Sequence, residues 1–189
     1  MMNTAPPAPT SPTVFIALFD TAMGHCGIAW SNAGICGVQL PEPDAGQTRQ
    51  RMCQRFPGAA EATPSPVVQT AIAGIAAMLR GEAHAHDALV FDMRGVPAFH
   101  HRVYGIARAI PAGQTLTYGE VAARLGEPGA ARAVGQALGR NPFAPVVPCH
   151  RVLAAGDKPG GFSASGGIRT KLRLLIMEGA MRGTPGLFD

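Results

Sequence analysis

The segment that decides the fold of this chain is residues 117–152, with the sequence TYGEVAARLGEPGAARAVGQALGRNPFAPVVPCHRV. It opens with Thr117 and Glu120 at the spacing of a capping box, so a helix is expected to begin here. The break Glu127–Gly129 follows, and a second helix is predicted over 130–140. Two short helices joined by a tight Gly/Pro turn predict a helix-turn-helix, whose second helix is normally the one offered to DNA. An ordinary helical hairpin has the same pattern.

Small residues along the second helix favour the DNA-binding alternative. They are Ala130, Ala131, Ala133, Gly135, Ala137 and Gly139. A bare face is poor for packing a core, but it lets the backbone approach a groove or a phosphate chain closely. Arg132 is then the large side chain near the start of the helix, and we expect it to project toward the nucleic acid.

A single thiol, Cys149, lies near the end of the segment in an apolar, proline-bracketed run, with His150 and Arg151 directly after it. A thiol acts as a nucleophile only as thiolate, and a neighbouring base or cation lowers its pKa. His150 and Arg151 supply both, so the sequence predicts a reactive cysteine. The competing interpretation is an inert buried cysteine, since free cysteine is among the most buried residue types.

Glu178 is an acid in an unfavourable position. The last helix is predicted from Gly167 to Gly179, with three basic residues on its outer side: Arg169, Lys171 and Arg173. Glu178 follows two leucines by three and four residues, so it faces the apolar side of that helix. It also lies at the helix C-terminus, where the macrodipole disfavours a carboxylate. We expect a histidine partner, and the alternative is a frayed, solvated glutamate.

The first half of the chain predicts a small α/β unit, so the whole chain is expected to be of the mixed α/β (α+β) class. Strands are expected over 14–20, 25–31 and 34–40 as a β-meander, followed by a loop over 57–64. A helix is expected to begin at the cap Ser65, with Pro66 in its first position, and to close at Gly81. A further amphipathic helix is marked by Phe99, Val103, Ile106 and Ile110. The predicted division is a disordered tail 1–13, an N-terminal domain 14–92, a C-terminal domain 93–182 and a tail 183–189.

Composition limits the classes of function. The chain has 189 residues, 47% of them hydrophobic, and no apolar stretch approaches the length of a membrane span. Its net charge of +4 fits an anionic partner such as nucleic acid without requiring one. The four cysteines lack paired spacing and no secretory signal is visible, so we expect reduced thiols inside the cell. His84, His86, His100 and His101 lack the paired spacing of a zinc site, so no metal is expected.

Several ordered blocks of the sequence resemble one family, the O6-alkylguanine-DNA alkyltransferases (methylated-DNA–protein-cysteine methyltransferases). The blocks are Thr117–Ala122, Ala130–Gly135, Arg140–Pro142, Pro148–Val152 (the active-site signature) and Leu175–Gly179. The resemblance implies a small ribonuclease H-like N-terminal domain and a mainly helical winged-helix or helix-turn-helix C-terminal domain. It implies a monomer without cofactor or obligate protein partner, which binds double-stranded DNA containing O6-alkylguanine and no membrane. Its location would be the cytoplasm, at the nucleoid when bound to DNA.

The resemblance also implies a mechanism. Cys149 would take the alkyl group from guanine O6 and keep it as a thioether, so that each molecule acts once. His150 would act through a water as the base, Glu178 would orient it, and Asn141 would be the hinge between the DNA-binding helix and the active-site segment. The sequence leaves open whether O4-alkylthymine is a second substrate.

For the DNA contacts, the resemblance implies that the second helix enters the minor groove and that the damaged nucleotide is flipped out of the stack. Arg132 would replace the extruded base and Tyr118 would assist flipping. Ala130, Ala131, Ala133 and Gly135 would permit the close approach. Arg151 would brace the site, and Ser163 would contact O6. Phe162 stands where the family often has tyrosine, and the loop 163–167 is longer than the common pattern.

Three other classes remain as alternatives. A non-enzymatic protein that binds lesions would share the fold, and a pocket altered around Phe162 would suit it. A helix-turn-helix regulator could use Cys149 to sense alkylation. A cysteine hydrolase is the weakest alternative, because nothing in the sequence indicates an oxyanion hole.

Overall fold

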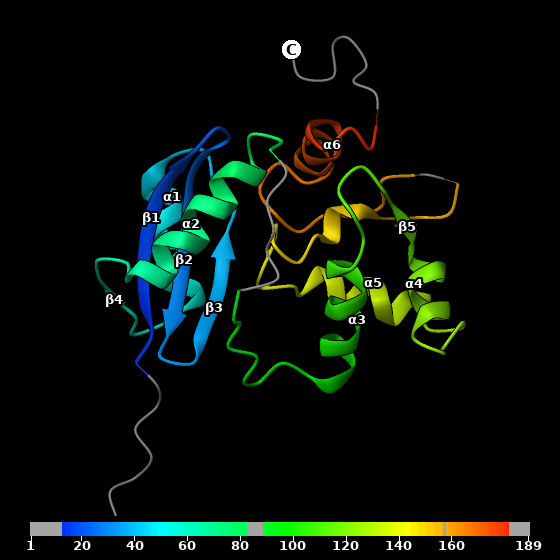
Figure 1. Ribbon diagram of the computed structural model, residues 1–189, viewed down its shortest axis with the longest axis horizontal. Coiled ribbons are helices and arrows are strands. Elements are labelled where there is room, and N and C mark those ends of the chain that lie inside the picture. Colours follow the sequence, from blue (N-terminus) through cyan, green and yellow to red (C-terminus); the bar gives the residue numbers. More distant parts are fainter. Residues whose placement is uncertain (1–12, 83–88, 157, 182–189) are drawn as a thin grey trace, which may run out of the picture.

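The computed structural model describes residues 13–82, 89–156 and 158–181. The predicted tails therefore lie outside the described residues, apart from Thr13, and so do His84 and His86. Within the described part of the chain, no helix has the length and apolar character needed to cross a bilayer. The architecture is mixed α/β, as predicted (Figure 1).

Three N-terminal strands form the predicted meander. Strands β1 (Phe15–Thr21), β2 (Gly24–Ser31) and β3 (Gly34–Gln39) pair antiparallel in chain order. A short strand, β4 (Ala60–Glu61), adds to β1 in parallel, so that the sheet order is β3-β2-β1-β4. The prediction of a loop over 57–64 is wrong at β4, because two residues are too few to show the alternation of a strand.

Two helices cover the sheet, one on each face (Figure 1). Helix α1 (Ala45–Arg55) is capped by the Asp44 side chain, which accepts a hydrogen bond from the Gln47 amide. Helix α2 (Pro66–Met78) begins after Ser65 as predicted, although the Ser65 side chain makes no capping hydrogen bond. A small cluster of Ile16, Ala29 and Met52 packs beneath α1, whereas α2 contributes to the main core.

The C-terminal half is mainly helical. Its elements are α3 (Ala98–Arg108), β5 (Leu116–Thr117), α4 (Tyr118–Arg124), α5 (Ala131–Gly139), the one-turn helix η1 (Cys149–Arg151), β6 (Val152–Leu153) and α6 (Ile168–Met177). The capping box is present, because the Thr117 hydroxyl accepts from the Glu120 amide and the Glu120 carboxylate accepts from the Thr117 amide. Strands β5 and β6 pair in parallel, which ties the start of α4 to the end of η1.

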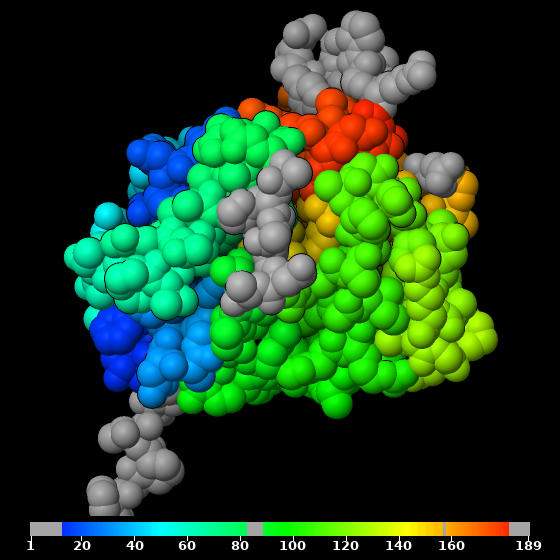
Figure 2. Space-filling model, viewed as in Figure 1, coloured from blue at the N-terminus to red at the C-terminus, as the bar shows by residue number. Residues whose placement is uncertain are grey.

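Both halves contribute to one buried core. The main cluster includes Trp30 of β2, Ile75 of α2, Tyr104 of α3 and Leu174 of α6. The end of α2 also meets α6, since a Cβ on Gly81 would lie 2.8 Å from the Met177 carbonyl oxygen. In the space-filling view the two halves lie against each other, with α6 above them (Figure 2). The ribonuclease H-like and winged-helix descriptions, and the domain boundary near residue 92, remain predictions.

Candidate active site

Cys149 is the first residue of η1, and its side chain is almost completely buried. A cavity of about 580 Å³ opens onto it. The lining brings together residues that are far apart in the sequence but were predicted to share a site: Tyr118, Ala131, Arg132, Gly135, Phe162 and Ser163. The thiol and the exposed side of α5 therefore face one hollow.

Helix α5 divides its small residues between two faces. Ala130, its N-cap, and Ala133 are half-buried and lie outside the lining of the cavity. Arg132 is exposed, as predicted. The prediction that Ala137 belongs to the bare face is wrong, because Ala137 is buried and its carbonyl accepts a 3.0 Å hydrogen bond from the Tyr104 hydroxyl. Ala137 follows Val134 by three residues, so both lie on the core side of the helix.

The Glu178 carboxylate forms hydrogen bonds with two buried side chains, those of His150 and Arg151. His150 Nε2 donates to Glu178 Oε1 at 2.9 Å, and Arg151 donates to both carboxylate oxygens at 2.8 Å. A further Arg151 nitrogen donates to the Ile110 carbonyl at 2.5 Å. Glu178 thus has the histidine partner that its position predicts, and the alternative of a solvated glutamate is wrong.

The charge states in this cluster follow from its contacts. Burial raises the pKa of Glu178, but the hydrogen bonds from His150 and Arg151 outweigh it and bring the pKa to about 2. Burial lowers the pKa of His150, against the opposing effect of Glu178. The imidazole is therefore neutral near pH 7. With Nε2 committed to Glu178, Nδ1 is the acceptor nitrogen, and it has no hydrogen-bond partner among the described residues.

The prediction that Lys171 lies on the outer side of α6 is wrong, because its side chain is only 1% exposed. Its Nζ donates to the Val152 carbonyl at 2.6 Å and lies 5.8 Å from the centroid of the Tyr118 ring. Helical spacing could have revealed this, since residues two apart do not share a face, whereas Arg169 and Arg173 are four apart.

The electrostatic environment of Cys149 differs from the predicted one. Burial raises the pKa of the thiol. The opposing influences are a hydrogen bond with Asn141, the charge of Lys171 and the backbone amides of Cys149 and His150. Arg151 is engaged by Glu178 instead of the thiol. The cation that favours the thiolate is thus Lys171, whose own pKa is lowered by burial to about 8.

Asn141 holds the segment that leads to the thiol. It follows α5 by two residues, and its side-chain amide donates to the Val147 carbonyl at 2.8 Å. Its side-chain oxygen accepts from the Phe143 amide at 2.9 Å. Both bonds lie within the segment between α5 and η1, and the role of Asn141 as a hinge remains a prediction.

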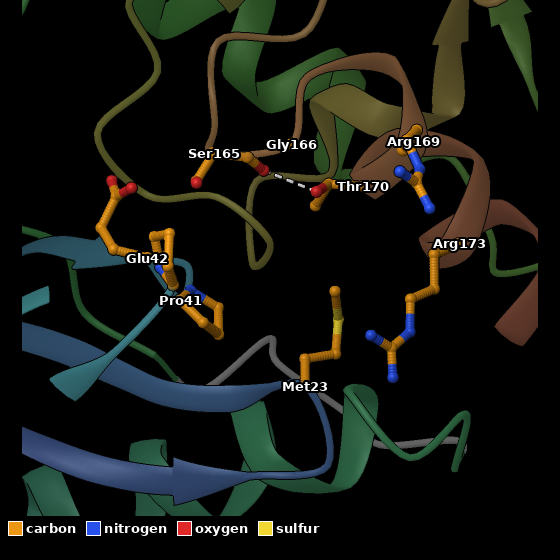
Figure 3. A pocket seen from close by; sticks show the side chains of 9 residues that line it. Met23, Pro41, Glu42, Ser165, Gly166, Arg169, Thr170 and Arg173 are labelled. Carbon is orange, nitrogen blue, oxygen red and sulfur yellow. Dashed lines mark hydrogen bonds between the residues drawn. The ribbon is translucent and has the colours of Figure 1, made fainter. Parts of the chain in front are cut away.

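A second cavity, of about 660 Å³, lies between the sheet and the start of α6 (Figure 3). Met23, Glu42, Ser165, Arg169 and Arg173 are among its lining residues. The Thr170 hydroxyl donates to the Ser165 carbonyl at its edge. Neither Cys149 nor His150 belongs to the lining, so this hollow is separate from the Cys149 thiol.

Comparison with known proteins identifies the family. The family model for the 6-O-methylguanine DNA methyltransferase DNA-binding domain matches residues 98–180. A methylated-DNA–protein-cysteine methyltransferase of Methanothermobacter thermautotrophicus is 35% identical over 153 residues, which cover 81% of this chain and 78% of the relative. The chain belongs to the methylated-DNA–protein-cysteine methyltransferase family.

Other relatives agree with this assignment. The methyltransferase of Mycobacterium tuberculosis strain H37Rv is 44% identical over 117 residues, covering 61% of this chain and 68% of the relative. The crystal structure of the Mycobacterium tuberculosis OGT in complex with DNA is similar, with a TM-score of 0.74 and 32% identity. The match covers 93% of this chain and 99% of that one. The chain is therefore an enzyme of the methylated-DNA–protein-cysteine methyltransferase class.

The described residues of this methyltransferase contain no group of three or more His, Cys, Asp or Glu side chains that could hold a metal ion.

Proposed function

We propose that the protein repairs duplex DNA directly, by transferring the alkyl group of O6-alkylguanine irreversibly to Cys149. The observation that carries this proposal is the shared cavity, whose lining includes both Cys149 and Arg132 of α5. Nucleophile and DNA-binding helix are thus arranged around one space. Family membership supports the same chemistry.

The transfer step needs no cofactor. The Cys149 sulfur, as thiolate, attacks the alkyl carbon, so that the S–C bond forms while the bond from carbon to O6 breaks. The bonding electrons go to the guanine, which takes up a proton from water, while the proton that His150 receives from the thiol returns to the solvent, so that no net proton is gained or lost. The thiol proton passes through a water to Nδ1 of His150, the acceptor nitrogen that lacks a partner among the described residues. The thioether does not reverse, so each chain acts once.

In this proposal His150 is the base and Glu178 orients it. Glu178 holds His150 through Nε2 and favours the imidazolium that forms when the proton arrives. Asn141 and Lys171 also favour the thiolate. These groups therefore favour the thiolate against the effect of burial, which raises the pKa of the thiol.

Access to the thiol requires that the nucleotide leave the base stack. A cavity of about 580 Å³ falls within the range of ligand pockets in proteins. Phe162 offers an aromatic face in it and Tyr118 a hydroxyl, while exposed Arg132 can fill the gap in the duplex. The relative in complex with DNA and the net charge of +4 support a DNA partner. We propose that the protein acts as a monomer at the nucleoid.

The intact mass of the protein after incubation with duplex DNA containing O6-methylguanine tests the proposal. We expect the gain of one methyl group, mapped to Cys149 and saturating at one per chain. Cys149→Ala should bind the same DNA with similar affinity and gain nothing. Tight binding without any mass change would instead place the protein among lesion sensors. The same assay with O4-methylthymine decides whether that base is a second substrate.

A further inference from the structure

We propose that Arg55, in the N-terminal α/β unit, is a positioning residue that fixes the Asn141–Cys149 segment and so sets the reactivity of the thiol. The inference rests on the proposed function in one respect, the identification of Cys149 as the acceptor. It gives the N-terminal half a defined part in the chemistry.

The Arg55 guanidinium bridges the two halves of the molecule. It lies at the end of α1, where Nη1 donates to the Val38 carbonyl and to Gln39 Oε1, both at 2.8 Å. Its Nη2 reaches into the C-terminal half and donates to the Pro142 carbonyl at 3.2 Å. The same Pro142 oxygen accepts the Val38 amide at 2.8 Å. The two donors together hold Pro142 against β3.

The surroundings of Arg55 indicate that this contact is built into the fold. Burial lowers the pKa of the guanidinium, and the Phe56 ring lies 5.3 Å from it. A Cβ on Gly37 would lie 2.7 Å from the Phe56 ring and 3.1 Å from both Arg55 Nη2 and the Pro142 oxygen. Only a residue without a side chain leaves room here. Burying a cation costs free energy unless its donors are satisfied, so the three oxygen acceptors are what makes this position tolerable.

Pro142 connects this contact to the thiol. It follows Asn141 by one peptide bond, and the Asn141 side-chain amide donates to the Val147 carbonyl, which also accepts the Cys149 amide, both at 2.8 Å. The Asn141 side chain also lowers the pKa of the Cys149 thiol, against the effect of burial. A cavity of about 300 Å³ adjoins Arg55, Asn141, Pro142 and Ala144. Asn141 and Pro142 are half-buried at this hollow, whereas Phe143 after them is completely buried. The hydrogen bonds to Pro142 therefore help to fix the Asn141 end of the segment, and we expect their loss to let Asn141 move relative to Val147 and the sulfur.

The test compares Arg55→Met with Arg51→Met. Arg51 lies one turn earlier on α1 and is exposed, so the control removes the same charge without the bridge. Iodoacetamide alkylation of Cys149, followed by mass spectrometry of its peptide across a pH series, reports the thiol pKa without any DNA. For Arg55→Met we expect the midpoint to rise by about half a pH unit to one pH unit, with a rate at pH 7 about threefold to tenfold lower. Arg51→Met should match the parent.

Two further measurements separate positioning from stability. In single-turnover methyl transfer, the amplitude counts folded protein and the rate constant reports the site. Arg55→Met should lower the rate constant equally on duplex O6-methylguanine and on free O6-benzylguanine, and Arg55→Lys should recover part of it, because one ammonium cannot bridge all three acceptors. A lower melting temperature or amplitude with an unchanged pH midpoint and rate constant overturns the proposal. A rate constant of Arg55→Met that falls on duplex DNA but not on free O6-benzylguanine also overturns the proposal. If the parent gains no methyl group, the proposed function fails, and the iodoacetamide series still decides the role of Arg55.

Discussion

Lys171 carries a charge that the fold has to bury. Its side chain is 1% exposed and its Nζ donates to the Val152 carbonyl, a neutral acceptor, so the ammonium is only partly compensated. The consequence is a pKa lowered to about 8, from 10.5. The same positive charge favours the Cys149 thiolate, because it lowers the pKa of the thiol.

We therefore expect Lys171→Met to slow the alkylation of Cys149 without lowering the free energy of unfolding. Methionine has nearly the same length and no charge, so the variant should unfold with a free energy at least as high as that of the parent. Loss of the cation should raise the thiol pKa, and Cys149 alkylation at pH 7 should slow by about tenfold if that pKa rises by one pH unit. Urea denaturation and the pH series of alkylation measure the two effects.

Arg169→Met is the matched control for Lys171→Met, because Arg169 is an exposed cation on the same helix. Arg169→Met should change neither the free energy of unfolding nor the alkylation rate of Cys149. A Lys171→Met protein that reacts at the parental rate would show that the ammonium has no part in the thiolate equilibrium.

Glu178 predicts a defined acid transition. Its folded pKa of about 2 lies below the ordinary value of 4.5, so its contribution to stability is present above pH 4.5 and is lost as the pH falls toward 2. The side chain is 6% exposed, and the lowered pKa corresponds to about 3 kcal/mol. Glu178→Gln should be less stable than the parent at pH 7 by about that amount, and the difference should vanish near pH 2. Denaturant titrations at several pH values measure it.

The control for the acid transition is Glu127→Gln, since Glu127 pairs with Arg102 on the surface, where an ion pair contributes little. Its stability should follow the parental curve. Equal pH dependence in the parent and in Glu178→Gln would contradict the assignment of the acid transition to Glu178.

The buried side of helix α5 supports the exposed Arg132. Val134, Ala137 and Leu138 anchor the helix in the core, so the exposed Arg132 is held at the mouth of the cavity by a rigid support. Arg132→Ala should therefore leave folding unchanged. In the proposed mechanism the Arg132 side chain offsets part of the few kcal/mol that base flipping costs, so the variant should slow methyl transfer from duplex DNA by about tenfold or more. Reaction with free O6-benzylguanine should proceed at the parental rate.

Single-turnover assays measure the rate constant of each variant on the duplex and on free O6-benzylguanine. Arg124→Ala, an exposed arginine on the neighbouring α4, is the control for a general loss of positive charge. If Arg132→Ala and Arg124→Ala slowed the duplex reaction alike, Arg132 would contribute only charge. If Arg132→Ala slowed both substrates alike, its effect would lie on the transfer step.

Elements differ in how far the sequence predicted them. Helix α4 was placed correctly because its capping box is local, and the meander because turn residues separate its strands. Helix α1 was missed, since its sequence AGQTRQRMCQR is polar and its buried residues are only Thr48 and Met52. The pairing of Glu178 with His150 was foreseen from an acid on an apolar face. The Arg55 contact was not, because it joins residues 87 positions apart and no local pattern encodes it.

The whole molecule should unfold as one unit, although its sequence predicts two domains. The main core contains side chains from both halves, and Arg55 and Val38 both bond across the junction to Pro142. Trp30, the sole tryptophan, is 7% exposed and reports on the N-terminal sheet. Most of the helical circular dichroism comes from the C-terminal half, which contains α3 to α6. The fluorescence and the helical signal therefore monitor different regions.

We expect the tryptophan fluorescence and the helical signal to share one urea midpoint, because neither half can keep its part of the core buried once the other opens. Iodoacetamide labelling of Cys149 at each urea concentration should rise at that same midpoint. Arg55→Met should lower all three midpoints together. A fluorescence transition that precedes the other two would mean that the sheet opens independently. The thiol would then keep its reactivity without the N-terminal half, which would contradict the coupling through Pro142.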